Sequence, residues 1–334
     1  MRLRIFESTT GLGVMMALAL ISTPANAAPD AAKASPSQPV ASSTVSGAKQ
    51  HAAQTYWTAD RMRSAKPGDR LLRGKSLADI TSKVAAGKPV TKAGTAGKSR
   101  GGKALLAFGG GYYTGGGNVV KTTGKVFFTL GGSNYQCSGS SAVSNNESVV
   151  QTAGHCVNEG PGAFATNFVF IPAYDDGARP YGTFAARQLV TASQWNGSGD
   201  LNYDVGFAVV SPVSGTTLTD KVGGQGIAFN QSRGQTMYAF GYPAASPYDG
   251  TDIAWCNGTV VNDAQGSDDQ GMVCDMTGGS SGGPWFVNYS ESTGIGTLNS
   301  VNSFKYNAPE LSDKMYGPYF GSVIKSVYSA AQKG

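Results

Sequence analysis

Short runs of β-branched and aromatic residues recur along the chain from about residue 104, separated by glycine, proline and polar residues. The runs are KVFFTL, SVVQTA, NFVFIPAY, YDVGFAVV, QTMYAFGYP, IAWCNGTVV and TLNSVNSF. Their composition and spacing are typical of strands in an all-β barrel or sandwich. Sustained helical periodicity is confined to the end of the chain, where FGSVIKSVYSAAQ predicts a C-terminal helix.

The beginning of the chain has a different pattern. Basic residues precede the apolar run GLGVMMALALIS, and small residues at Ala25 and Ala27 follow it. This order predicts a secretory signal peptide, residues 1–27. The apolar run is too short to span a bilayer as a helix, and no later run is long enough. We therefore expect a secreted, extracellular protein that has no membrane attachment after signal cleavage.

The stretch between the signal peptide and the strand-rich region is poor in large apolar residues. Residues 28–53 are rich in Ala, Ser, Pro and Lys, which predicts a linker or disorder. QTYWTADRMRSAKP and SLADITSKVAAGKP predict two short helices. The basic, glycine-rich segment 91–103 is typical of an exposed site of proteolysis. We divide the chain into a signal peptide, a basic and partly disordered pro-segment, 28–103, and a globular domain, 104–334.

The N-terminal part of the chain and the strand-rich part also differ in charge. Residues 1–100 hold 15 Lys and Arg against 5 Asp and Glu, whereas residues 101–334 hold 11 against 16. The formal net charge of +5 is therefore the sum of a basic part and an acidic part. We expect the pro-segment to cover the acidic domain as an inhibitor or folding aid, and not to bind nucleic acid. We also expect the mature domain to be monomeric.

Four cysteines in an exported chain predict disulfides, and we expect Cys137 to pair with Cys156 and Cys256 with Cys274. Four cysteines nevertheless allow three connectivities. Only two histidines are present, so we do not expect a structural metal site. We also expect no cofactor. Paired aspartates in DDG and GSDD leave a calcium site open, although such pairs are usually just solvated.

The stretch GGSSGGP contains a serine held between glycines. A glycine two residues before Ser281 allows the backbone to turn so that the N–H groups of Gly279 and Ser281 point at one spot. Such convergence is what an oxyanion hole requires. A Gly/Ser-rich linker is the alternative, but the aromatic pair that follows at once does not suit a linker.

Two further elements supply a base and a carboxylate. QTAGHC places His155, the histidine of the strand-rich region, in a turn after a strand. NYDVGFAVV places Asp204 at the start of another strand, where a buried carboxylate could orient the imidazole. Asp200, in a more polar glycine-rich loop, is the alternative carboxylate.

In this order, TAGHC, DVGFAVV and GxSGGP resemble the motifs of trypsin-like serine peptidases, over roughly residues 120–330. The resemblance implies two six-stranded antiparallel β-barrels of the chymotrypsin type, with the site between them. GKVFFT, YGTFAARQL and CDMTGGSSGGPW are similar to secreted bacterial members, akin to the glutamyl-endopeptidase branch and especially those of actinobacteria.

The resemblance assigns the roles. Ser281 becomes the nucleophile, His155 the general base and then acid, and Asp204 the orienting carboxylate, with Gly279 and Ser281 as the oxyanion hole. The implied function is a secreted serine endopeptidase that is made as a precursor and hydrolyses peptide or protein substrates through an acyl-enzyme. A non-catalytic, peptidase-like binding module is the alternative function.

Specificity and activation depend on residues that differ from the family pattern. Asp275 matches in spacing the acid at the base of the trypsin pocket, which would favour Lys or Arg substrates. The alternative for Asp275 is a salt-bridged residue in the wall of the pocket. Ser280 stands where animal trypsins pair an aspartate with the new N-terminus, so we expect activation by removal of the pro-segment. The cut is expected between Lys98 and Asn118. The residues expected to line the substrate pocket are Asp275, Ser300, Val301, Asn302 and Ser303.

Overall fold

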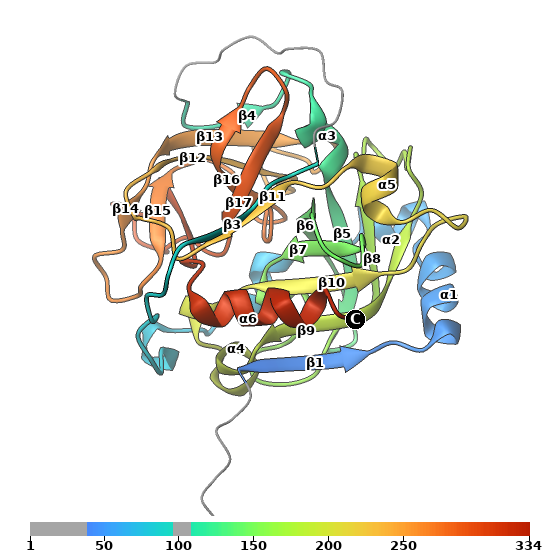
Figure 1. Cartoon of the computed structure of the whole chain (residues 1–334), viewed down its shortest axis with the longest axis horizontal. Helices are drawn as coiled ribbons and strands as arrows, with labels where there is room; N and C mark the ends of the chain where they lie inside the picture. The colour runs from blue at the N-terminus through green and yellow to red at the C-terminus, as the bar shows by residue number, and fades with distance from the viewer. Residues whose placement is uncertain (1–38, 96–107) are drawn as a thin grey trace, which may run out of the picture. The chain divides into compact units, whose positions relative to one another are not determined.

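The computed structural model describes residues 39–95 and 108–334 (Figure 1). All of them belong to one unit, Gln38–Gly334. The predicted signal peptide and the basic residues 96–103 lie outside the described ranges. Within those ranges, no helix combines the length and the apolar character needed to cross a bilayer.

Six antiparallel strands of the first half close into a barrel. Hydrogen-bond pairing runs in the order β9–β10–β7–β6–β5–β8 and returns from β8 to β9. The strands are β5 (Thr123–Leu130), β6 (Ser133–Ala142), β7 (Val149–Thr152), β8 (Thr166–Pro172), β9 (Phe184–Ala192) and β10 (Gly206–Val210). The predicted all-β fold, with its barrel, is confirmed here.

The second half is less regular. Its pairing is divided between a seven-stranded sheet, ordered β3–β11–β17–β16–β12–β13–β4, and a three-stranded sheet, β14–β15–β18. The strands are β3 (Val90–Lys92), β4 (Gly111–Tyr112), β11 (Gly226–Phe229), β12 (Thr236–Gly241), β13 (Ala254–Thr259), β14 (Val261–Asn262), β15 (Gln270–Val273), β16 (Pro284–Ser290), β17 (Ile295–Val301) and β18 (Lys314–Gly317). Unlike the first half, these pairings do not close a six-stranded ring.

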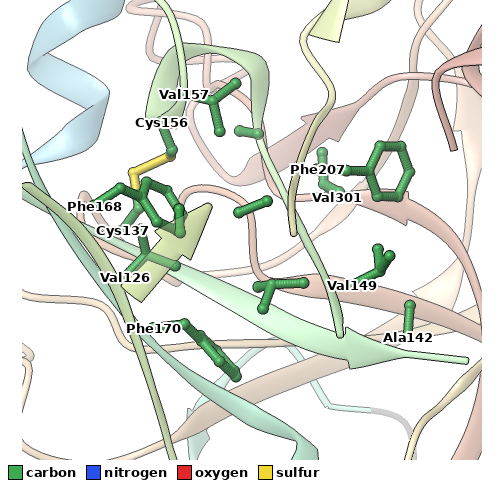
Figure 2. Packing of buried hydrophobic residues seen from close by; sticks show 14 of the residues in the cluster. Val126, Cys137, Ala142, Val149, Cys156, Val157, Phe168, Phe170, Phe207 and Val301 are labelled. Atoms are coloured by element: carbon green, nitrogen blue, oxygen red, sulfur yellow. A yellow bond between two sulfur atoms is a disulfide. The ribbon is translucent and has the colours of Figure 1, made fainter. Parts of the chain in front are cut away.

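Two hydrophobic clusters fill the interior. The larger one includes Val126, Phe168 and Val301, and Figure 2 shows part of its packing around the Cys137–Cys156 disulfide. The smaller one lies in the second half and contains the Cys256–Cys274 disulfide. Both predicted cysteine pairings are therefore confirmed.

After residue 108 the helices are short, apart from the one that ends the chain. The described helices and 3₁₀ turns after residue 108 are α3 (Asn118–Thr122), η3 (Gly154–Cys156), α4 (Ser193–Ser198), η4 (Leu201–Tyr203), α5 (Leu218–Val222) and α6 (Ser322–Ala331). Helix α6 is the predicted C-terminal helix. It buries Ile324, Val327 and Tyr328, and it packs against β9 and β10 of the first barrel (Figure 1).

The described part of the predicted pro-segment is folded onto both halves. It forms β1 (Val40–Thr44), α1 (Gly47–Tyr56), α2 (Ala59–Arg63), β2 (Lys66–Pro67), and the 3₁₀ turns η1 (Gly68–Leu72) and η2 (Leu77–Asp79), and it ends in β3. Strand β1 pairs with β9 of the first barrel, and β3 pairs with β11 of the second sheet.

The prediction of a linker or disorder over residues 28–53 is wrong for residues 39–53. Composition misled because β1 gains its order from backbone pairing with β9, which needs few apolar side chains. The two helices predicted after residue 53 are also only partly right. Most of α1 precedes the first predicted segment, and the second contains just the turn η2.

Trp57 anchors this segment. Its side chain is 2 % exposed, its indole N–H donates to the carbonyl of Asn167 at 2.6 Å, and its ring lies 5.3 Å from that of Phe127. Burying an indole of this size contributes several kcal/mol. The segment is therefore held by a large apolar contact as well as by strand pairing.

We expect Trp57→Ala to lower the free energy of unfolding of the full chain by about 3–5 kcal/mol, because it empties a buried site. Trp57→Phe should cost less, because it keeps most of the packing and loses the indole hydrogen bond. Urea unfolding of the full chain measures both. His51→Ala is the control, because His51 lies at an exposed position of helix α1, which ends just before Trp57. Unchanged stability of the alanine variant would contradict docking through Trp57.

Candidate active site

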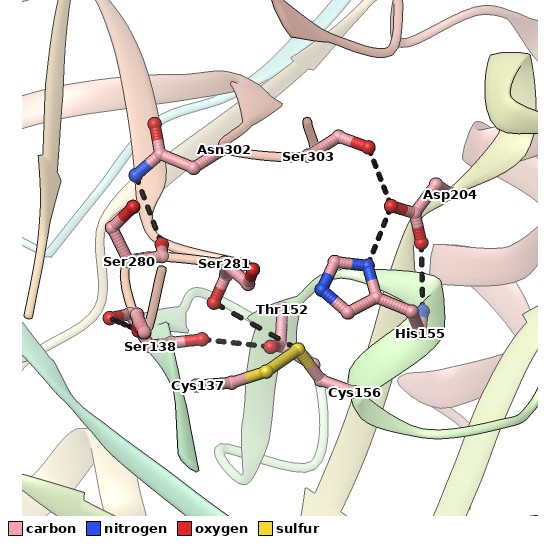
Figure 3. The surroundings of a disulfide bond; sticks show 12 residues. Cys137, Ser138, Thr152, His155, Cys156, Asp204, Ser280, Ser281, Asn302 and Ser303 are labelled. Atoms are coloured by element: carbon pink, nitrogen blue, oxygen red, sulfur yellow. Dashed lines mark hydrogen bonds and ion pairs between the residues drawn. A yellow bond between two sulfur atoms is a disulfide. The ribbon is translucent and has the colours of Figure 1, made fainter. Parts of the chain in front are cut away.

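His155 and Asp204 form a buried pair within the first barrel. His155 lies in the turn η3 after β7, and Asp204 follows the turn η4 just before β10. The Nδ1 atom of His155 lies 2.7 Å from Oδ2 of Asp204, and the backbone N–H of His155 donates to Oδ1 at 2.7 Å. Both contacts fix the imidazole, so its second nitrogen is held in one direction. Figure 3 shows Asp204 on one side of the ring and Ser281 on the other.

A third donor reaches the carboxylate from the second half of the chain. The hydroxyl of Ser303 donates to Oδ2 of Asp204 at 2.5 Å. Burial by itself would raise the pKa of Asp204, but the charge of His155 and the hydrogen bonds from His155 and Ser303 outweigh burial and lower this pKa. Asp204 is therefore held ionised beneath the imidazole.

The other nitrogen, Nε2 of His155, is buried and has no hydrogen-bond partner among the described residues. A buried polar nitrogen without a hydrogen-bond partner costs free energy. The arrangement leaves Nε2 available on the side that faces Ser281 (Figure 3).

The alternative carboxylate, Asp200, serves a different purpose. It does not bond to His155 but accepts hydrogen bonds from the backbone and hydroxyl of Thr81, at 2.8 and 2.9 Å. It is fully buried, although its loop is polar and rich in glycine. Hydrogen bonds from Thr81 and from the backbone N–H of Asn202 replace the hydration of the Asp200 carboxylate, which permits its burial.

The loop that carries Ser281 needs its glycines. Gly279 has φ of +99° and Gly282 has φ of +77°, a region that favours glycine. A Cβ on Gly283 would lie 2.0 Å from the carbonyl oxygen of Phe240, so that residue also has no space for a side chain. No hydrogen bond within the described residues takes up the N–H of Gly279 or of Ser281. Both donors are thus available to an oxyanion.

Polar residues of the first barrel hold the same loop. The Ser138 backbone N–H donates to the carbonyl of Ser281 at 2.7 Å, and the Ser138 hydroxyl donates to the carbonyl of Gly279 at 3.0 Å. Gln151 donates to the carbonyl of Gly282 at 2.9 Å. These bonds join the loop of the second half to strands β6 and β7, and so set Ser281 relative to His155 (Figure 3).

A cavity of about 900 Å³ adjoins Ser281. Its domain side is lined by Leu201, Met276, Thr277, Gly278, Ser280, Ser281, Ser303, Phe304, Lys305, Tyr306, Asn307 and Met315. The other side is lined by residues 69 and 72–77 of the predicted pro-segment. The cavity is therefore a cleft beside Ser281 that is covered by part of the predicted pro-segment.

Residues 65–84, which we call the strap, cross the site. The side chain of Gln136 donates to the carbonyl of Ala65, and Lys66 and Pro67 run parallel to β6. A Cβ on Gly68 would lie 2.4 Å from Sγ of Cys137 and 3.8 Å from Cδ2 of His155. Beyond the cavity, Asn202 and Asp268 hold the strap through the carbonyl of residue 82 and the N–H of residue 84.

The strap is held mainly by backbone contacts and apolar packing. Between it and the rest of the described chain, one ion pair is present, Lys83 with Asp268 at 3.2 Å, and the lysine is exposed. Exposed pairs of this kind contribute little to stability. The opposite charges of the two parts of the sequence therefore do not translate into a network of ion pairs at the strap.

Asp275 does not line the cavity beside Ser281. It is exposed, its Oδ1 accepts a hydrogen bond from the hydroxyl of Tyr248 at 2.6 Å, and it lines a separate cavity of about 570 Å³ with Phe108 and Gly110. Burial and the Asp275 carboxylate raise the pKa of Tyr248, so that hydroxyl remains a donor. The prediction that Asp275 forms the base of the primary pocket is wrong because the carboxylate turns outward.

The other expected pocket residues separate into two groups. Ser303 lines the cavity, whereas Ser300, Val301 and Asn302 do not. Their side chains are buried in structural roles. Ser300 donates to the carbonyl of Pro318, and Asn302 donates to the carbonyl of Ser280 at 3.0 Å. Sequence reasoning missed Met276 and Met315, since an apolar residue carries no sign that it borders a cavity.

The described residues contain one cluster of three atoms that could ligate a metal, from Cys137, His155 and Cys156. The two sulfur atoms are joined in a disulfide, so they are not thiolates. The residues present here therefore do not fit a metal.

With this geometry described, we compared the chain with known proteins. Residues 137–295 match the model of the trypsin-like peptidase domain. The structure of the protease Anisep from Arthrobacter nicotinovorans is 52% identical, with a TM-score of 0.61 over 64% of this chain and 96% of that one. The thermostable serine protease AL20 from an extremophilic microorganism is 44% identical, with a TM-score of 0.61 over 65% of this chain and all of that one. The chain therefore belongs to the trypsin-like serine peptidases.

Two more distant relatives add less. A Glu endopeptidase structure, 16% identical with a TM-score of 0.52, covers 72% of this chain and all of its own, and it shares the fold. The extracellular metalloprotease of Bacillus subtilis (strain 168) is 28% identical over 162 residues. The match covers 48% of each chain, so this chain spans about half the length of that curated relative.

We expect Ser303→Ala to destabilise the protein by about 1.5–3 kcal/mol at neutral pH, because a hydrogen bond to a buried carboxylate is lost. The pKa of Asp204 is lowered in the folded state, so this contribution is present above the unfolded pKa and disappears as pH falls through the folded pKa. Urea unfolding between pH 7 and pH 3 measures it. Ser300→Ala, whose hydroxyl bonds to a neutral carbonyl, should show a loss that does not depend on pH.

Proposed function

We propose that this protein is a secreted endopeptidase that hydrolyses peptide bonds through an acyl-enzyme on Ser281, and that it is made as a precursor. The observation that carries the proposal is the buried pair of His155 and Asp204, whose unbonded Nε2 faces the serine loop. The two disulfides suit an exported protein. Residues 1–27 would be the signal peptide, 28–103 the pro-segment and 104–334 the peptidase domain.

The chemistry follows from the positions of these groups. His155 takes the proton of the Ser281 hydroxyl as that oxygen attacks the substrate carbonyl, and it then passes the proton to the departing amine. Asp204 holds the imidazole in the required tautomer and stabilises its charged form. The N–H groups of Gly279 and Ser281 receive the negative oxygen of the tetrahedral intermediate. Water then releases the acyl group by the same steps.

We expect Ser281→Ala to abolish peptide hydrolysis, with kcat about a million-fold lower, because the nucleophile is lost. The processed protein should also be labelled by a fluorophosphonate, whereas the variant should not. Ser326→Ala, on helix α6, is the control for folding and labelling. A wild-type protein that stays unlabelled while circular dichroism shows it folded would instead support a non-catalytic binding module.

The strap would inhibit the precursor. It covers His155 and lines the open side of the cavity. The direction of its backbone explains why it would not be hydrolysed there. The cavity beside Ser281 would take the side chain that precedes the cut bond, so the acyl half of a substrate lies along residues 303–305. The leaving half then passes His155 toward the Cys137–Cys156 disulfide.

The strap runs the opposite way. Pro67 and Gly68 lie at the disulfide, and the following residues, up to Leu77, line the cavity. A reversed chain presents its carbonyl and N–H groups in the wrong order for attack by Ser281 and protonation by His155. The strap would therefore block the site without being hydrolysed there. Activation would require removal of the pro-segment, with the cut between Lys98 and Asn118.

We expect Gly68→Leu in the full chain to speed fluorophosphonate labelling of the uncut precursor at least tenfold. A side chain at residue 68 would collide with Sγ of Cys137 and with the carbonyl of Gln136, so it would lift the strap. Intact-mass spectrometry separates uncut labelled protein from processed protein. Gly47→Leu is the matched control, because its Cβ would meet nothing within 4 Å. An uncut wild-type precursor as active as the processed enzyme would overturn inhibition by the strap.

A further inference from the structure

Two methionines line the cavity beside Ser281. Met276, fully buried, and Met315, 5% exposed, line it from two different segments and both belong to the smaller hydrophobic cluster. A side chain that packs against this part of the lining therefore meets two thioether side chains backed by a packed core. Methionine is flexible and polarisable, so it adapts to aliphatic and aromatic partners alike.

The charge in the cavity does not favour a basic substrate. Of the described domain residues that line it, Lys305 alone carries a charged group, and it is a cation. The carboxylate of Asp275 lies in the separate cavity, which Lys305 also borders. A substrate lysine or arginine would thus meet a like charge and no carboxylate, which disfavours its binding.

An acidic side chain is not favoured either. The ammonium group of Lys305 already donates to the carbonyls of Cys274, at 2.6 Å, and Ser312, at 3.3 Å. Burial lowers the pKa of Lys305, although Asp275 and Asp313 oppose this effect. A carboxylate placed between Met276 and Met315 would lose its hydration, and Lys305 is already engaged elsewhere.

The strap provides a second, independent indication. Leu72 and Leu77 line the covered side of the same cavity and pack against the larger hydrophobic cluster. Both side chains are only partly buried, so part of their apolar surface remains outside the core. The strap thus lines the cleft with these two aliphatic side chains, together with the charged Asp69, Arg73 and Lys75.

We propose, on the basis of the peptidase function above, that the primary pocket selects a large apolar residue, Leu, Met or Phe, immediately before the cut bond. Met276 and Met315 are the specificity-determining residues. Lys305 forms the wall that excludes basic side chains. Neither basic nor acidic residues are preferred at this position.

The test uses processed enzyme whose active Ser281 has been counted by fluorophosphonate titration. A series of peptides, identical except for Leu, Met, Phe, Ala, Glu or Lys before the cut bond, provides kcat/KM for each. We expect Leu, Met and Phe to exceed Ala, Glu and Lys by at least tenfold, since contacts of a few methylene groups in an apolar pocket discriminate by this amount. Met315→Ala should lower the values for Leu and Phe about tenfold relative to the value for Ala.

Met272→Ala is the matched control, because Met272 is a buried member of the same cluster that does not line the cavity. It should lower thermal stability and leave the order of preference unchanged. Lys305→Gln should keep the preference for Leu. A wild-type preference for Glu that Lys305→Gln removes, a preference for Lys, or a flat profile in titrated enzyme would each overturn the pocket assignment alone. Enzyme that cannot be titrated would overturn the peptidase function, and the pocket proposal with it.

Discussion

A buried carboxylate and the three donors that satisfy it determine the rest of the site. Asp204 is inaccessible to solvent, and an ionised group in such a place is stable only when hydrogen bonds replace its hydration. His155 supplies two of the donors and Ser303 the third. Because Ser303 comes from the second half of the chain, the same carboxylate that orients the imidazole also fixes the two halves against each other.

The loop that carries Ser281 is subject to the same constraint, because its buried polar groups also need hydrogen-bond partners. Its carbonyl groups would be buried without partners if strands β6 and β7 carried the apolar side chains usual for a barrel interior. Ser138 and Gln151 stand there instead and bond to the loop. Polar residues at buried strand positions thus hold the Ser281 loop beside the turn that carries His155. The site depends on contacts between the halves more than on either barrel alone.

The sequence was informative where chemistry imposes a strict local pattern. The glycines around Ser281, the strand before His155 and the position of Asp204 were predictable, because a positive φ, a tight turn and a strand start each restrict residue type. The strand β6 was not recognised among the apolar runs. Its residues Ser138, Ser140 and Ser141 are fully buried but polar, so the hydrophobic pattern that marks a strand is absent.

The prediction for Asp275 was wrong for a related reason. Spacing from the nucleophile determines where its backbone lies but not which way its side chain turns, and Tyr248 holds it outward. Residues 40–44 show the same limit for a whole segment, since they form a strand through pairing with a distant strand that composition cannot indicate. Tertiary partners, and not local propensity, decided both outcomes.

The proposed pro-segment is attached at two separate strand edges. Strand β1 on β9, β3 on β11 and the indole of Trp57 all lie on the N-terminal side of the expected cut. A single cleavage would therefore leave a nicked, non-covalent complex in which the site is still covered. Activity would appear only when the fragment dissociates or is degraded, and the dissociated fraction at equilibrium would rise on dilution and fall at higher protein concentration.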